Sequence, residues 1–202
     1  MDLIPSEEQV REHLVRTGAL RQGHFRHASG PHSDLYLQIP LAMRYYDESK
    51  ILSVALSRKL RQDDAVRRAV PNVSVVVPAT GGLPIAFGVA EALRAAQTYW
   101  AEKNDQGGLE LRQFVTIQPG ERVILVDDIL RTGRKLTQLR KLVEAAGAKV
   151  LALAVLVHQP FANCARFDDL PFFQLLTLAP HYWTAQDCPL CAQKVPAIEV
   201  SE

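Results

Sequence analysis

The stretch VILVDDILRTGRK, residues 123–135, constrains the fold more than any other part of the chain. Its first four residues are apolar and mostly β-branched, which is typical of a buried strand in a parallel sheet. Asp127 and Asp128 follow directly, and a turn containing Thr132 and Gly133 then leads into a helical pattern. Two acids at a strand end are usually only a solvated turn, but this longer order is far more specific. It predicts one unit of an α/β fold with a ligand site at the carboxyl end of its strand.

The same order of strand, loop and helix recurs along the chain. Apolar runs predict strands at 73–77, 98–101, 109–117, 123–126 and 150–157, and helical spacing predicts helices at about 6–17, 47–61, 84–96 and 135–146. Residues 23–43 alternate weakly and carry glycine and proline, which predicts a hairpin. We therefore expect an α/β protein of one domain, with an open, mostly parallel sheet flanked by helices.

Composition excludes several classes of partner. The net charge of +1 gives no electrostatic argument for nucleic acid. No apolar run approaches the roughly 18 residues that span a membrane. The N-terminus lacks a basic-then-apolar signal, and the three cysteines cannot all pair with one another. We expect a soluble, cytoplasmic protein that binds neither membrane nor nucleic acid.

Two of the predicted strand ends carry the chemistry of a sugar-phosphate site. The strand at 73–77 is followed by PATGG, residues 78–82, in which glycines let backbone amides approach an anion. The turn at 131–135 opens a helix, whose N-terminus favours anions, and it carries three basic side chains. Between them, Asp127 and Asp128 suit two ribose hydroxyls and can hold Mg²⁺ through water.

These motifs resemble those of a known family. Residues 123–135 resemble the phosphoribosyl pyrophosphate (PRPP) signature of type I phosphoribosyltransferases. Four further segments resemble the orotate branch of that family: its N-terminal hood in SGPHSDLY (29–36), its pyrophosphate loop in VVVPATGGLPIAFGVAEAL (75–93), its mobile catalytic loop in AEKNDQGG (101–108), and the tail of one bacterial group in CPLC (188–191). The resemblance implies the type I fold, with a hood at about 1–45, a core at about 46–180 and a cysteine-containing tail at 181–202.

The resemblance implies an orotate phosphoribosyltransferase. Such a glycosyltransferase moves the phosphoribosyl group of PRPP to orotate, giving orotidine 5′-monophosphate and pyrophosphate for pyrimidine biosynthesis. The resemblance also implies that the enzyme uses Mg²⁺ as cofactor and that it is a homodimer. The implied catalytic residues are Asp127, Asp128 and Lys103, the last borne by the neighbouring subunit. The implied PRPP-binding residues are Thr80, Gly81, Gly82, Asp127, Asp128, Arg131, Thr132, Gly133, Arg134 and Lys135. The implied base contacts are Ser29, His32 and Gln159, and Asp127 and Asp128 would hold Mg²⁺ through water.

Three places depart from the family pattern. Arg131 and Lys135 stand where the family usually has small or hydroxyl residues. Gln159 stands where orotate enzymes carry an arginine that grips the orotate carboxylate, and a neutral amide cannot form that bidentate charged pair. The loop at 101–108 has one lysine. Two alternatives therefore stay open: a phosphoribosyltransferase for another nucleobase, and a non-catalytic regulator that binds PRPP or a nucleotide.

The motif Cys188-Pro-Leu-Cys191 supplies half of the four ligands that a structural zinc site needs. Cys164, His181 and Asp187 are close enough in sequence to be further ligands. From the sequence alone, we favour a turn with two reduced thiols over a metal site.

Overall fold

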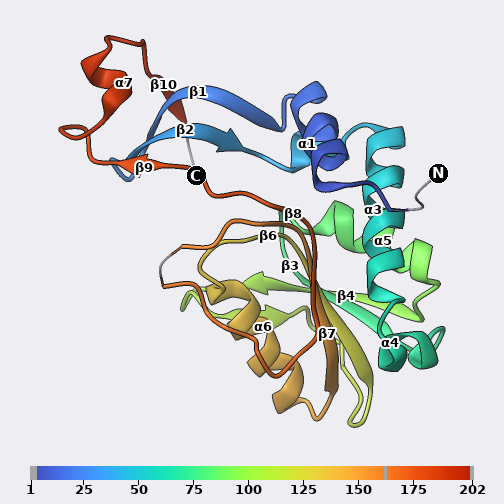
Figure 1. Cartoon of the computed structure of the whole chain (residues 1–202). Helices are drawn as coiled ribbons and strands as arrows, with labels where there is room; N and C mark the ends of the chain where they lie inside the picture. The colour runs from blue at the N-terminus through green and yellow to red at the C-terminus, as the bar shows by residue number, and fades with distance from the viewer. Residues whose placement is uncertain (1–3, 162, 201–202) are drawn as a thin grey trace.

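The computed structural model describes residues 4–161 and 163–200, and its centre is a sheet of six strands (Figure 1). The strands, in chain order, are β3 (Ser74–Pro78), β4 (Gln97–Lys103), β5 (Leu109–Leu111), β6 (Arg122–Leu130), β7 (Lys149–His158) and β8 (Phe172–Thr177). Their order across the sheet is β5-β4-β3-β6-β7-β8, and all neighbouring pairs are parallel except the antiparallel pair β4–β5.

This order contains a switch point. The chain runs from β3 outward to β4 and β5, and then returns to place β6 on the other side of β3. Connections therefore leave β3 and β6 in opposite directions, which opens a crevice outside the carboxyl ends of these two strands. The crevice lies where residues 78–82 and the aspartates of β6 meet.

Helices cover both faces of the sheet. The strand β6 is apolar on both sides, and each of its apolar faces is buried by helices. Ile124 and Val126 pack into a core with α3 (Tyr46–Leu60), α4 (Asp64–Ala69) and α5 (Leu83–Leu93), whereas Val123 and Leu125 pack against α6 (Arg134–Ala145) (Figure 1). Successive residues of a strand point to opposite faces, so a continuous apolar run is needed to fill both cores. The predicted fold class is confirmed.

A second, smaller sheet joins the two ends of the described chain. It has the order β10-β1-β2-β9, in which β1 (Leu20–His27) and β2 (His32–Leu37) form the predicted hairpin, and β9 (Tyr182–Trp183) and β10 (Ile198–Val200) come from the tail. The short helix α7 (Pro189–Ala192) lies beside this sheet (Figure 1). We call this unit the hood sheet. From the sequence we described the hood and the tail as separate segments, but strands of both pair in this one sheet.

The N-terminal helix α1 (Glu7–Arg16) begins at a capping box, in which the Ser6 hydroxyl accepts from the Gln9 backbone and the Gln9 side chain accepts from the Ser6 backbone. A single turn, α2 (Pro40–Met43), then leads into α3. None of the helices in the described ranges is both long and apolar enough to cross a membrane.

The structure corrects several predicted boundaries. The strand predicted at 123–126 continues to Leu130, so that Asp127 and Asp128 lie within β6 rather than after it. The strand predicted at 109–117 is only the three residues of β5. The helix α4 and the strands β8, β9 and β10 were not predicted from the sequence.

Candidate functional site

Asp127 and Asp128, the acid pair, lie near the carboxyl end of β6. Asp127 is 3% exposed, and its Oδ1 accepts a hydrogen bond from the Asp128 backbone nitrogen at 2.9 Å. One oxygen of Asp128 accepts similarly from the Ile129 nitrogen at 2.9 Å. These local bonds fix both carboxylates, one buried and one partly accessible, at the edge of the crevice.

Residues 78–82, the glycine loop, pack directly against the acid pair. A Cβ built on Gly81 would lie 2.7 Å from Asp128 Oδ2, and one built on Gly82 would lie 2.6 Å from Asp127 Oδ1. The loop can approach this closely only because neither residue has a side chain. Its start is held by the Ala79 nitrogen, which donates to the Ala101 carbonyl of β4 at 2.7 Å, and Thr80 is exposed.

Little positive charge compensates the acid pair. Burial raises the pKa of Asp127 well above its usual range, the neighbouring charge of Asp128 raises it further, and Lys135 only partly opposes these effects. Such a carboxylate pair is stabilised by hydroxyl donors or by a cation brought in with a ligand. A strongly perturbed group in a crevice is also what functional sites commonly show.

The residues at 131–135, the phosphate turn, form the N-terminus of the twelve-residue helix α6. Gly133 precedes it with φ 76°, and a Cβ there would lie 2.7 Å from the Cβ of Ala165. The exposed side chains of Arg134 and Lys135 lie in the first turn, which contains no acid. Cations there oppose the helix dipole, so the arrangement is favourable only when an anion binds between them.

The structure joins Arg131 and Gln159, which we had considered separately from the sequence. Arg131 Nε donates to Gln159 Oε1 at 2.6 Å. Gln159 is 3% exposed, and its backbone nitrogen donates to the Leu130 carbonyl at 2.8 Å. A buried amide therefore orients the Arg131 guanidinium at the end of β6, and no other hydrogen bond ties that guanidinium to a described residue.

The remaining predicted residues lie apart from the acid pair. Lys103 is exposed at the end of β4, where the Asn104 side chain accepts from the Gly108 nitrogen at 2.8 Å and closes the turn to β5. Ser29 is exposed in the turn between β1 and β2. His32 is 5% exposed, and its Nδ1 lies 2.7 Å from His24 Nε2, so that its ring faces the interior of the hood sheet.

The companions that we considered for Cys188 and Cys191 are engaged elsewhere. His181 contacts Asp34 at 2.8 Å, Asp187 accepts from the Thr184 hydroxyl at 2.7 Å, and the Cys164 thiol contacts the Ala165 carbonyl. His24 and His32 lie with the two cysteines instead. The sequence analysis missed His24, although two histidines on a predicted hairpin together with a Cys-x-x-Cys motif were a usable signal.

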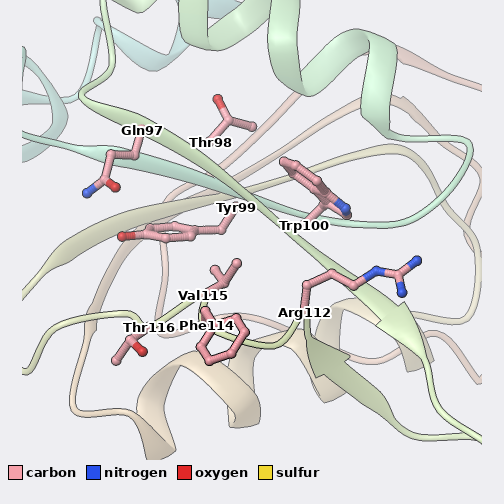
Figure 2. A pocket seen from close by; sticks show the side chains of 8 residues that line it. All are labelled: Gln97, Thr98, Tyr99, Trp100, Arg112, Phe114, Val115 and Thr116. Atoms are coloured by element: carbon pink, nitrogen blue, oxygen red, sulfur yellow. The ribbon is translucent and has the colours of Figure 1, made fainter.

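A surface pocket lies beside β4 and the segment that follows β5 (Figure 2). It is lined by Gln97, Thr98, Tyr99, Trp100, Arg112, Phe114, Val115 and Thr116. Because Gln97 pairs with Ser74 at the start of β3, this pocket extends toward the amino end of the strands, away from the crevice. It contains none of the site residues predicted from the sequence.

The fold and the crevice together define a class of enzyme. The family model of the phosphoribosyl transferase domain matches residues 46–190, and the chain belongs to this family of transferases. Its curated relatives are orotate phosphoribosyltransferases. The protein from Thermus thermophilus is 34% identical over 191 residues, 95% of this chain and 99% of the relative, and that from Pelotomaculum thermopropionicum is 35% identical over 195 residues, 96% of both chains.

Solved structures agree at the level of the fold. The crystal structure of orotate phosphoribosyltransferase from Aeropyrum pernix matches with a TM-score of 0.67 and 22% identity, over 84% of this chain and 93% of that one. The predicted resemblance to the orotate branch of the phosphoribosyltransferases is confirmed by the curated relatives, and the fold by the solved structure.

Proposed function

We propose that the protein transfers the phosphoribosyl group of PRPP to orotate, giving orotidine 5′-monophosphate and pyrophosphate in pyrimidine biosynthesis. The observation that carries the proposal is the contact between the glycine loop and the acid pair in the crevice between β3 and β6. This contact brings an anion-binding loop and a diol-binding pair within the length of one sugar phosphate.

The site divides PRPP among three groups. The ribose hydroxyls donate to the acid pair, which offsets the burial that raises the pKa of Asp127. The 5′-phosphate binds the amides of the phosphate turn, including those of Thr132 and Gly133, and the cations of Arg134 and Lys135. The pyrophosphate lies on the glycine loop, where Thr80, Gly81 and Gly82 offer backbone amides.

The acid pair also fits Mg²⁺, since two carboxylates with little compensating charge are the oxygen donors that this ion prefers. When bound, Mg²⁺ would neutralise charge on pyrophosphate and orient it.

In the transfer itself, a ring nitrogen of the base loses its proton to water and forms a bond to C1 of the ribose as the bond from C1 to the pyrophosphate oxygen breaks. The pyrophosphate leaves with that electron pair. We assign Lys103 to stabilise this developing charge in the site of a neighbouring subunit, because it stands exposed on the hairpin of β4 and β5, from which it can reach a second chain. Closure of the hairpin would also exclude water.

Arg131 is our candidate for recognition of the orotate carboxylate. Its guanidinium is oriented by the buried Gln159, at the place where the family resemblance predicts an arginine. The cation would therefore come from the phosphate turn instead of from the neighbouring strand. Ser29 stays a proposed base contact, whereas the inward-facing ring of His32 makes it the weaker one.

The same pair of residues motivates one alternative, a phosphoribosyltransferase for another nucleobase, since the amide of Gln159 could recognise a neutral base. Incubation with PRPP, Mg²⁺ and each nucleobase, with pyrophosphate release as the readout, separates the possibilities. Turnover with orotate alone supports our proposal, and turnover only with another base supports the alternative. Binding of PRPP by calorimetry without any turnover would instead support the non-catalytic regulator.

The sugar site has its own test. We expect the double variant Asp127→Asn/Asp128→Asn to lose PRPP affinity. Each neutral amide has one acceptor oxygen in place of two charged ones, so it binds ribose hydroxyls and Mg²⁺ less well than a carboxylate does. Asp168→Asn is the control, since Asp168 is exposed and, among the described residues, forms an ion pair only with the exposed Arg166. Unchanged PRPP affinity by calorimetry in the double variant would disprove the site.

A further variant separates base recognition from phosphate binding. We expect Arg131→Leu to raise KM for orotate by about 10- to 100-fold, the loss of one charge-assisted pair. KM for PRPP should change much less. A rise confined to KM for PRPP would place Arg131 on the 5′-phosphate and refute its role toward the carboxylate.

We also propose that the protein is a cytoplasmic homodimer. Several large apolar side chains are exposed, among them Phe114 at 93%, Phe87 at 50% and Trp100 at 37%. The rings of Phe87 and Trp100 lie 6.1 Å apart, and Phe114 and Trp100 line the pocket of Figure 2. A second copy of the chain covering this surface would remove it from water.

A further inference from the structure

Four side chains of metal-binding types meet between the hairpin of the hood sheet and the turn at α7. They come from three separate parts of the chain. His24 comes from β1, His32 from β2, and Cys188 and Cys191 from the turn that forms α7. One ligand atom from each residue lies within 4.8 Å of all the others. We call these four residues the His–Cys cluster; Figure 1 shows α7 beside β1 and β2, where the tail folds back.

The distances centre on one ring nitrogen. His24 Nε2 lies 2.7 Å from His32 Nδ1, 3.5 Å from Cys188 Sγ and 3.6 Å from Cys191 Sγ. Cys191 Sγ is also 3.3 Å from His32 Nδ1. His24 and Cys188 are almost fully buried, at 3% and 2% exposure, so water cannot serve these groups freely.

Hydrogen bonds within the cluster cannot account for this arrangement. His24 Nδ1 contacts the Val195 carbonyl at 2.8 Å, and a carbonyl can only accept, so Nδ1 carries the proton. The Nε2 lone pair then points into the cluster, where it can accept one hydrogen although three polar groups surround it. A carbonyl behind the ring is also the usual partner of a metal-binding histidine, because it fixes the tautomer and the orientation of the ring.

The spacing matches a tetrahedral ion. Bonds of about 2.3 Å to sulfur and about 2.0 Å to nitrogen place tetrahedral nitrogen and sulfur ligands about 3.5 Å apart. Three nitrogen–sulfur distances within the cluster, 3.3, 3.5 and 3.6 Å, agree with this value. The two imidazole nitrogens, at 2.7 Å, would separate by about half an ångström on binding, which a small ring rotation provides.

We propose that His24, His32, Cys188 and Cys191 bind one Zn²⁺ ion. Two thiolates and two imidazoles in a tetrahedral arrangement are the ligands that select zinc over harder ions such as Mg²⁺. Four protein ligands leave no position for a substrate, so the site is structural and distinct from the crevice.

The ion links the tail to the hood. Without it, the tail is held by three-residue β10, two-residue β9 and a few polar contacts such as those of Val195 with His24 and of His181 with Asp34. The helix α7 is a single turn with no buried residue among its described members. Through the ion, the histidines of β1 and β2 are joined to both cysteines, so that the loop between β9 and β10 is attached to the hairpin. Removal of the ion should therefore loosen residues 184–197 before the core sheet unfolds.

Metal content of the purified full-length chain tests the proposal. We expect about one zinc per chain in the wild type and in Cys164→Ser, whose sulfur lies outside the cluster, and loss of zinc in Cys188→Ser and Cys191→Ser. His181→Ala is the matched histidine control, because His181 pairs with Asp34 on the surface. Co²⁺ in place of zinc should show the visible absorption of a tetrahedral thiolate site in the wild type and both controls.

A measurement on the wild type keeps the test independent of variant folding. Zinc should protect Cys188 and Cys191 from alkylation and the tail from proteolysis, and a chelator should remove both protections. A reduced wild-type chain that takes up no zinc on addition of the ion would overturn the proposal. So would alkylation of Cys188 and Cys191 at the same rate with and without zinc, or a Cys188–Cys191 disulfide as the stable form of the protein.

Discussion

At the scale of single residues, the site depends on two glycines that do different things. The space where Gly81 would carry a Cβ is occupied by the Asp128 carboxylate, mainly by its Oδ2. This carboxylate can rotate away. A Cβ built on Gly82 would meet the Asp127 carboxylate, would lie 2.7 Å from Val77 Cγ2 and would lie 3.3 Å from the Asp127 backbone. All of these atoms are in the buried interior. In our proposal, Gly81 therefore matters for ligand binding, and Gly82 matters for both ligand binding and packing.

We therefore expect two neighbouring substitutions to differ. Gly81→Ala should displace the Asp128 carboxylate and weaken PRPP binding by tenfold or more, at ~1.4 kcal/mol per tenfold, with little change in Tm. Gly82→Ala should also lower the free energy of unfolding by about 1–3 kcal/mol, the usual effect of overpacking. Calorimetric titration with PRPP and thermal unfolding measure the two effects. Equal loss of stability in both variants would contradict this division of roles.

At the scale of elements, α1 is held on α3 by one carboxylate. Glu48, in the first turn of α3, accepts from Arg16 at 2.5 Å and contacts His13 Nδ1 at 2.5 Å. Burial acts to raise the pKa of Glu48, but the bonds from Arg16 and His13 outweigh it, so the pKa lies below its usual value. The two helices are thus joined through an ionised side chain that is 9% exposed.

This pairing predicts a pH-dependent contribution to stability. A carboxyl whose folded-state pKa is depressed stabilises the fold above its unfolded pKa of about 4.3, and the contribution is lost as the pH falls through the folded value. Glu48→Gln should therefore lower the free energy of unfolding by about 1–2 kcal/mol near neutral pH, and the difference from wild type should shrink below about pH 4. Urea unfolding over this range measures it. The exposed Glu12→Gln on α1 is the control, and a difference independent of pH would rule out the ion pair as its cause.

At the scale of the whole molecule, the proposed dimer raises the question of which subunit would supply Lys103 to each site. In the described chain, Lys103 is exposed at the tip of its hairpin, and no hydrogen bond or ion pair joins it to the acid pair. The resemblance predicts that this lysine serves the neighbouring site of a dimer. Exposed apolar rings on β4 and α5 offer a surface for such a dimer.

A mixture of two inactive variants tests this assignment. Lys103→Ala should lower kcat by about 100-fold or more through loss of charge stabilisation, while Lys149→Ala, an exposed lysine at the opposite end of the strands, should be unchanged. Co-expressed Lys103→Ala and Asp128→Asn chains should recover about a quarter of the wild-type activity, because each mixed dimer contains one intact site. No recovery in mixed dimers would mean that Lys103 acts within its own subunit.

The sequence alone determined the features that depend on local pattern. The apolar run before Asp127 predicts a strand buried on both faces, and Gly133 before a helical pattern predicts an anion-binding helix start, because each depends on neighbours in the chain. The motif at 123–135 therefore predicted the fold class and the enzyme family correctly. The boundaries were less certain: β6 continues through the acid pair because β7 pairs with it as far as Leu130, and that pairing is not encoded locally.

Which distant residues meet is evident only from the folded chain. The hydrogen bond from Arg131 to Gln159 and the meeting of His24 with Cys188 each join residues separated along the chain, by 28 and 164 positions. Short tail strands such as β9 and β10 have no periodicity of their own and form because β1 and β2 offer them edges to pair with. Local pattern specifies elements, but contacts between elements follow from packing of the whole chain. The proposed base contact and the His–Cys cluster both depend on such contacts.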